Sequence, residues 1–87
     1  MRWILELAIK KYGPEMQKTV AVEEMSELIK EICKDKRGND NYLPISEEIA
    51  DVEIMLEQLK LIYNVGPLVE VQKQKKLNRL QERLNNK

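Results

Sequence analysis

The chain has 87 residues, a formal net charge of zero, 43% hydrophobic residues and 34% charged residues. This length indicates one domain over residues 1–87, and the composition is that of a globular protein rather than a disordered one. A core of this size buries only about 60% of the unfolded surface, so we expect the chain to self-associate. Neutral charge argues against nucleic acid as a partner. Without a long apolar segment or a signal peptide, we expect a cytoplasmic protein that does not enter a membrane.

Three breaks divide the chain, at Gly13-Pro14, at residues 37–44 and at Gly66-Pro67. They predict four helices, over residues 2–12, 14–36, 44–64 and 67–85. Proline at the start of the last three suits the first helical turn, where its missing N–H is not needed. No segment resembles a strand. The predicted fold is therefore all-α, a small four-helix bundle-like protomer that forms a homo-oligomer.

The first helix carries a narrow apolar stripe that includes Trp3 and Leu7. A lone tryptophan on such a stripe could stack on a nucleobase, but we expect Trp3 to be a core residue. Cys33, the only cysteine, falls among apolar positions of the second helix, and we expect it in the core as well. No intrachain disulfide is possible.

Acidic residues line another side of the second helix, apart from its apolar arc. At about 100° per residue, Glu24, Glu27 and Glu31 share this side, and Gln17 falls on it one or two turns earlier. By itself this is an ordinary amphipathic helix with a solvated acidic face.

The third helix differs because Glu48 projects from within the main apolar arc, and Asp51 lies at the edge of that arc. A carboxylate in a buried arc is unfavourable unless it is paired or bound to a metal ion. A second apolar ridge, of Ala50, Ile54 and Leu61, makes this helix apolar on two sides. We therefore expect it to pack against its own bundle on one side and against a second subunit on the other.

Acid pairs three residues apart on two facing helices can surround a divalent cation with four carboxylates. Oxygen ligands select Mg²⁺ or Mn²⁺, and a chain with no histidine and one cysteine is a poor zinc protein. Mg²⁺ commonly binds a few carboxylates together with substrate phosphates, so the pattern indicates a phosphate-handling site.

The last helix provides positive charge. Leu77, Leu80 and Leu84 form an apolar stripe, with Lys76 and Arg79 beside it. These basic side chains could clamp a phosphate, or they could belong to a solvated face that attracts the acidic helices electrostatically.

The acidic pattern resembles that of the MazG-like, all-α nucleoside triphosphate pyrophosphohydrolases. It reads EEMSE over residues 23–27 and, twenty residues later, EIAD over residues 48–51. KKLNRL, residues 75–80, looks like the basic helix of that family. The resemblance covers the last three predicted helices and implies Mg²⁺-dependent hydrolysis of an NTP or dNTP to the monophosphate and pyrophosphate. It also implies assembly as a homodimer or homotetramer.

Site roles follow from this resemblance. It implies Glu24, Glu27, Glu48 and Asp51 as metal ligands, Glu23 and Glu27 as candidates for taking a proton from water, and Lys76 and Arg79 as substrate-binding residues. Gln17, on the same face as Glu24, is a further substrate-binding candidate from its position, or else an ordinary residue of the helix surface. The chain lacks the additional aromatic residues that larger relatives use around the base, so the preferred nucleotide stays open. Two other classes of function are a helical regulatory module without turnover and a nucleic-acid binder that uses the basic helix.

Overall fold

The computed structural model describes residues 2–86 and consists of four helices, with no strand in that range. Their bounds are α1 Arg2–Tyr12, α2 Pro14–Lys36, α3 Tyr42–Tyr63 and α4 Gly66–Asn85. The all-α prediction is confirmed. The bounds of α1 and α2 are as predicted, whereas α3 begins two residues before Pro44 and ends one residue before the predicted end.

Backbone geometry explains the two sharpest junctions. Gly13 has a φ of 89°, a left-handed value that favours glycine, and Pro14 then opens α2. Asn64 follows α3 with a φ of 55°, and its N–H bonds to the last turn of that helix. The chain therefore turns between α1 and α2, and again between α3 and α4, within a few residues.

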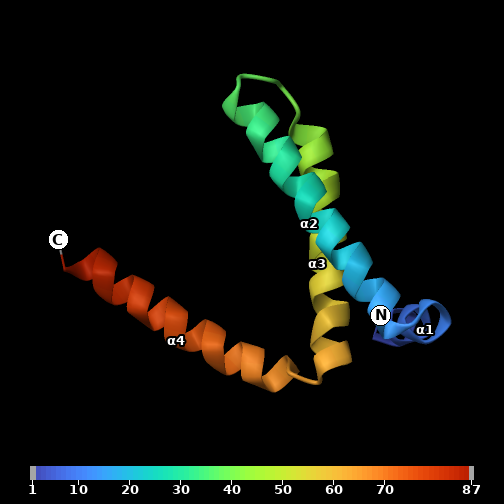
Figure 1. Cartoon of the computed structure of the whole chain (residues 1–87). Helices are drawn as coiled ribbons and strands as arrows, with labels where there is room; N and C mark the ends of the chain where they lie inside the picture. Colours follow the sequence, from blue (N-terminus) through green and yellow to red (C-terminus); the bar gives the residue numbers. More distant parts are fainter. Residues whose placement is uncertain (1, 87) are drawn as a thin grey trace.

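α2 and α3 form an antiparallel helical hairpin, and α1 packs beside one end of it (Figure 1). α4 leads away from the end of α3 and touches the rest of the chain only near its own start. The predicted bundle-like protomer is therefore wrong for the single chain. Three helices pack together and the fourth extends, because the turn between α3 and α4 does not fold α4 back along α3.

The chain is too extended to enclose a core. Its radius of gyration is 16.0 Å, against about 12 Å for a compact domain of this length. It exposes 7078 Å², and about 1,700 Å² of this exceeds what a compact monomer of its mass exposes. Only Ala21 and Met55 are buried hydrophobic residues in the part of the chain that the structure describes.

Two predicted core residues lie on the surface instead. Trp3 is 65% exposed and Cys33 is exposed. Both predictions came from apolar stripes on single helices, and such a stripe does not say whether another helix of the chain covers it.

A wide apolar groove of about 850 Å³ lies between α1, α3 and the first turns of α4. Each of the three helices lines the groove, with Ile4 on α1, Ile54 on α3 and Val69 on α4 among the lining residues. Ala50 and Ile54 of the predicted second ridge line it, on the side of α3 away from α2. α3 therefore carries apolar side chains on both of its sides, although only one of them meets another helix along its length.

Over residues 2–86, no helix combines the length and the apolar character needed to cross a bilayer.

Candidate metal centre

Three carboxylates meet in the middle of the hairpin. Oxygen atoms of Glu24 on α2 and of Glu48 and Asp51 on α3 all lie within 4.8 Å of one another. Glu48 and Asp51 share a face of α3 because three residues make nearly one helical turn. The antiparallel pairing of α2 and α3 places Glu24 opposite them, so two helices contribute to one cluster.

Glu48 is the most constrained member of this cluster. It is half-buried, and its Oε1 atom is shielded from solvent without a hydrogen-bond partner in the described part of the chain. Burial raises the pKa of Glu48, and the neighbouring carboxyl of Glu24 raises it further, with smaller contributions from Asp51 and Glu27. Each cause disfavours the charged carboxylate, so the cluster is unfavourable when it is fully ionised and has no counter-charge.

The other two predicted site acids, Glu27 and Glu23, lie outside this group of three carboxylates. Glu27 is exposed and outside the group of three, yet it is close enough to raise the pKa of Glu48. Glu23 is exposed on α2. Three of the four predicted ligands thus lie close together, with Glu27 one turn further along α2.

Gln17 does not lie free on the acidic side, as its helical position had suggested. Its side chain is buried, and its Nε2 donates a hydrogen bond of 2.9 Å to Oε1 of Gln58 on α3. The prediction that it faces a substrate is not met within one chain, because a buried amide satisfies its hydrogen bonds with the nearest polar partner.

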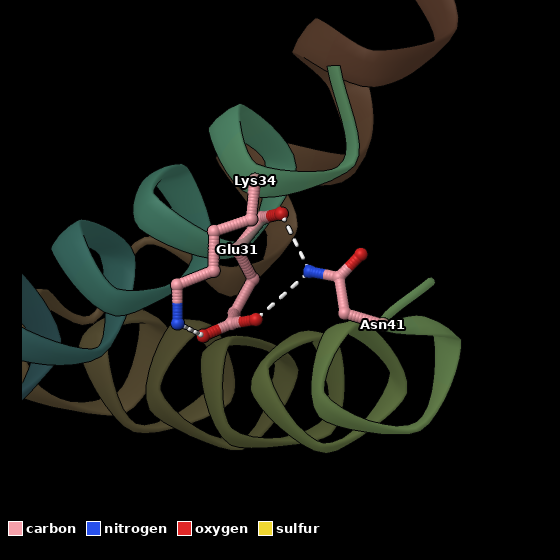
Figure 2. Close-up of polar contacts among 3 residues, drawn as sticks. All are labelled: Glu31, Lys34 and Asn41. Carbon is pink, nitrogen blue, oxygen red and sulfur yellow. Dashed lines mark hydrogen bonds and ion pairs between the residues drawn. The ribbon is translucent and has the colours of Figure 1, made fainter. Parts of the chain in front are cut away.

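A second buried polar contact lies at the loop end of the hairpin (Figure 2). Nδ2 of Asn41 donates 2.9 Å bonds both to the backbone oxygen and to Oε1 of Glu31, and Lys34 pairs with Oε2 at 3.2 Å. The bond from Asn41 is the largest cause that lowers the pKa of Glu31, followed by the bond from Lys34. Asn41 precedes α3 but gives it no side-chain cap, because its amide is turned to α2.

Lys76 and Arg79 lie on the exposed part of α4. The structure does not bring them to the acidic cluster of their own chain, because α4 leads away from the hairpin (Figure 1). Lys87, which the sequence marks as another basic residue of this segment, lies outside the described residues.

The donor set fits a hard divalent cation. It offers carboxylate oxygens from two helices, one of them orphaned and shielded, and it contains no nitrogen or sulfur ligand. Sequence reasoning found Glu24, Glu48 and Asp51 but missed Gln58 and Asn41. The signal that could have found them was a spacing of seven residues along the chain. Gln58 follows Asp51 by seven residues, and Asn41 precedes Glu48 by seven.

No family model matches the chain, and neither curated proteins nor solved structures provide a match.

Proposed function

We propose that the chain is a Mg²⁺-dependent nucleoside triphosphate pyrophosphohydrolase of the MazG-like type, with Mn²⁺ as an alternative ion. The observation that carries the proposal is the shielded, unpartnered Oε1 of Glu48 beside the carboxylates of Glu24 and Asp51. A purely structural role would favour a basic partner for such a group, because an unpaired buried charge is strongly unfavourable. A divalent cation provides that missing charge.

In this proposal Glu24, Glu48 and Asp51 hold the ion, and Glu27 completes the set from the next turn of α2. A bound divalent cation supplies counter-charge for phosphate oxygens and lowers the pKa of a bound water. Glu27 and Glu23 are exposed and can accept a proton from water at the edge of the cluster. The raised pKa of Glu48 means that its ionised form, the form that binds a cation, is disfavoured in the ion-free cluster, and a bound cation would offset this.

The triphosphate itself calls for positive side chains, which the hairpin lacks near its acidic cluster. Lys76 and Arg79 are the proposed phosphate ligands, with arginine suited to two parallel bonds and lysine to a point charge. Because α4 leads away from its own hairpin, we place these residues at the site of a second copy of the chain. Gln17 joins the substrate-binding set only if its bond to Gln58 opens.

The apolar groove between α1, α3 and α4 is proposed to receive that second copy. The excess exposed area of about 1,700 Å² is twice the roughly 800 Å² that each partner buries in an interface of standard size. The charged residues of the groove balance, with Glu53 and Glu57 opposed by Lys60 and Lys73, and Lys60 pairs with Glu57 at 2.8 Å. The far half of α4 carries the apolar stripe of Leu77 and Leu80, so an amphipathic helix from another copy suits this groove through its apolar face.

The alternative is a helical regulatory module that binds the ion but does not turn over nucleotides. The exposed apolar faces of every helix favour that possibility equally, since a module also needs a partner. Release of pyrophosphate from a panel of NTPs and dNTPs, with Mg²⁺ or Mn²⁺, separates the two. We expect pyrophosphate and the monophosphate with at least one member of the panel. Ion binding without any product would favour the regulatory module.

A further inference from the structure

Polar residues occur along the hairpin in three layers, of which the first and the last are buried. In the middle layer Glu24 and Glu48 are half-buried and Asp51 is exposed. On α2 the members are Gln17, Glu24 and Glu31, each seven residues after the previous one. On the opposite side, the first layer has Gln58, the middle layer has Glu48 and Asp51, and the last has Asn41. Spacing of seven residues keeps side chains on the seam between two packed helices. The acidic cluster is therefore flanked on the same seam by one polar pair on each side.

The apolar part of this seam defines the alignment of the two helices poorly. Ala21 and Met55 are the only buried hydrophobic residues of the described chain, and apolar contacts are non-directional. A slide of α3 along α2 by one turn would move side chains by about 5.4 Å. That is more than the 4.8 Å within which the three carboxylates meet, so such a slide would separate Glu24 from Glu48.

The flanking Gln17–Gln58 and Glu31–Asn41 pairs, in contrast, form their hydrogen bonds in one alignment of α2 and α3. Gln17 and Gln58 are 6% and 4% exposed and share a bond of 2.9 Å. Asn41 is 8% exposed and binds Glu31 through two bonds of the same length. A slide would take these hydrogen bonds from Gln17, Gln58 and Asn41 and would leave the Glu31 carboxylate with only Lys34 of its own helix, and buried polar groups that lose their partners are unfavourable. Directional bonds of this kind specify register in paired helices.

We infer that the Gln17–Gln58 and Glu31–Asn41 pairs are positioning residues that set the register of the hairpin and thereby assemble the acidic cluster. None of the four is in the group of three carboxylates, and while the Gln17–Gln58 bond is closed they act through the relative height of α2 and α3. The consequence for ion binding rests on the proposed function, whereas the consequence for register does not.

Two double variants of the full chain test this inference, Gln17→Met/Gln58→Met and Glu31→Met/Asn41→Leu, together with their combination. Each replaces both partners by apolar groups of similar shape, which preserves packing while it removes direction. Spin labels at Thr19→Cys and Ser46→Cys, in a Cys33→Ser background, report the height of α2 relative to α3 because all three positions are exposed. The matched control is Gln74→Ala/Asn78→Ala, which removes a 2.9 Å amide pair that lies wholly within α4.

We expect one narrow distance in the parent chain and in the control. The combined variant is expected to remain folded but to melt somewhat lower than the parent, because Asn41→Leu removes the donor to the main-chain oxygen of Glu31. It is also expected to show a broadened or shifted distance and to lose affinity for Mn²⁺ by about tenfold or more, the range seen when supporting residues of a metal site are removed. A parent-like single distance in the combined variant would overturn the inference. Loss of folding in the combined variant would also overturn it, because the pairs would then be needed for stability rather than for alignment.

The two proposals fail in different ways. If the parent chain binds no Mn²⁺, the proposed function fails, and the label distances still decide the register. If Mn²⁺ binds equally well to parent and combined variant while the distance broadens, the pairs set register but do not position the carboxylates, and the inference is wrong.

Discussion

Glu24 of α2 and Glu48 of α3 hold carboxylate oxygens within 4.8 Å of each other across the hairpin. The contact is repulsive when both are ionised, and it contributes to the raised pKa of Glu48. Two helices that keep such a contact must align for another reason, and the flanking amide pairs provide one. The same contact becomes favourable when a divalent cation lies between the carboxylates, which links ion binding to the stability of the hairpin.

Glu48→Gln is expected to reduce Mn²⁺ affinity and pyrophosphate release by about 100-fold or more, since a ligand matters at least as much as the residues behind it. The fold is expected to survive, and the ion-free protein to melt higher at neutral pH, because one repelling charge is gone. The measurements are Mn²⁺ titration, product release and thermal melting in a chelator. Glu47→Gln, one residue earlier and exposed, is the matched control and is expected to resemble the parent. Full activity in Glu48→Gln would rule out the site.

The pH dependence of stability gives an independent measure of Glu48. When folding raises the pKa of a carboxyl, its stabilising contribution to the folded state is complete at pH values below the unfolded pKa of about 4.5. This contribution disappears as the pH rises through the folded pKa. The ion-free parent should therefore lose stability relative to Glu48→Gln as pH rises above 4.5. Melting curves across this range, with chelator, measure the difference. A constant difference at all pH values would contradict burial and carboxyl repulsion as the causes of the raised pKa of Glu48.

The contribution of Glu31 to stability should change with pH in the direction opposite to that of Glu48. Its pKa is lowered, so its contribution to stability is present above the unfolded value of 4.5 and disappears as pH falls through the folded pKa. Asn41→Ala removes the largest cause of that shift and leaves a buried main-chain carbonyl without its donor. We expect a loss of about 1–3 kcal/mol in unfolding free energy at neutral pH, measured by urea denaturation. Asn39→Ala in the same loop is exposed and serves as the control.

Ile54→Lys places a charge in the apolar groove and is expected to dissociate or unfold the protein. The parent chain should sediment as a dimer or larger at low micromolar concentration, because one chain alone encloses almost no core. Thr19→Lys adds the same charge to an exposed position of α2 and is expected to leave assembly unchanged. A well-folded monomeric parent at that concentration would show that the groove is not an interface between copies.

Lys76→Ala and Arg79→Ala are expected to lower kcat/KM by about 10- to 100-fold, the equivalent of one hydrogen bond to a charged group. Mn²⁺ binding without nucleotide should be unchanged, because the ion ligands are on α2 and α3. Lys75→Ala is the control, because Lys75 is an exposed basic residue of α4 that is not among the proposed phosphate ligands. Parent-like kinetics in all variants would make the basic side of α4 a solvated face.

Mixing two impaired variants tests whether the site is shared between chains. Glu48→Gln and Arg79→Ala each lack one part, and a mixed assembly contains a site with both parts if α4 serves a second copy. We therefore expect activity to rise above that of either variant alone when the two are unfolded together and refolded. Activity that stays at the level of the separate variants would place Arg79 and Glu48 in the same chain or would remove Arg79 from the site.

Local signals in the sequence predicted the helices well, and tertiary features less well. Gly13, Pro14 and Asn64 act within a turn or two, so the breaks could be predicted from neighbours alone. The Glu24–Glu48 meeting could be predicted because both helices repeat one acidic spacing. Trp3 and Cys33 were placed wrongly because a helical stripe shows that a partner exists but not whether it belongs to the same chain.

The polar pairs were missed for a related reason. Glutamine is common on helix surfaces, and nothing local distinguishes Gln17 from a solvated residue. Its burial follows only from the register of α3, which places Gln58 opposite. The sequence did not indicate the direction of α4 either. A short turn after Asn64 is compatible with a helix that packs back along α3 as well as with one that extends away from it.

The extended position of α4 also bears on how quickly the molecule forms. α2 and α3 are joined by a short loop, so the hairpin closes through contacts that are local along the chain and is expected to form fast. If the apolar stripe of α4 is covered only by another copy, that step is a bimolecular encounter whose rate rises with protein concentration. Refolding is then expected to show a rapid phase that does not depend on dilution, followed by a slower phase that does, with the basic helix accessible to proteases during the interval between them.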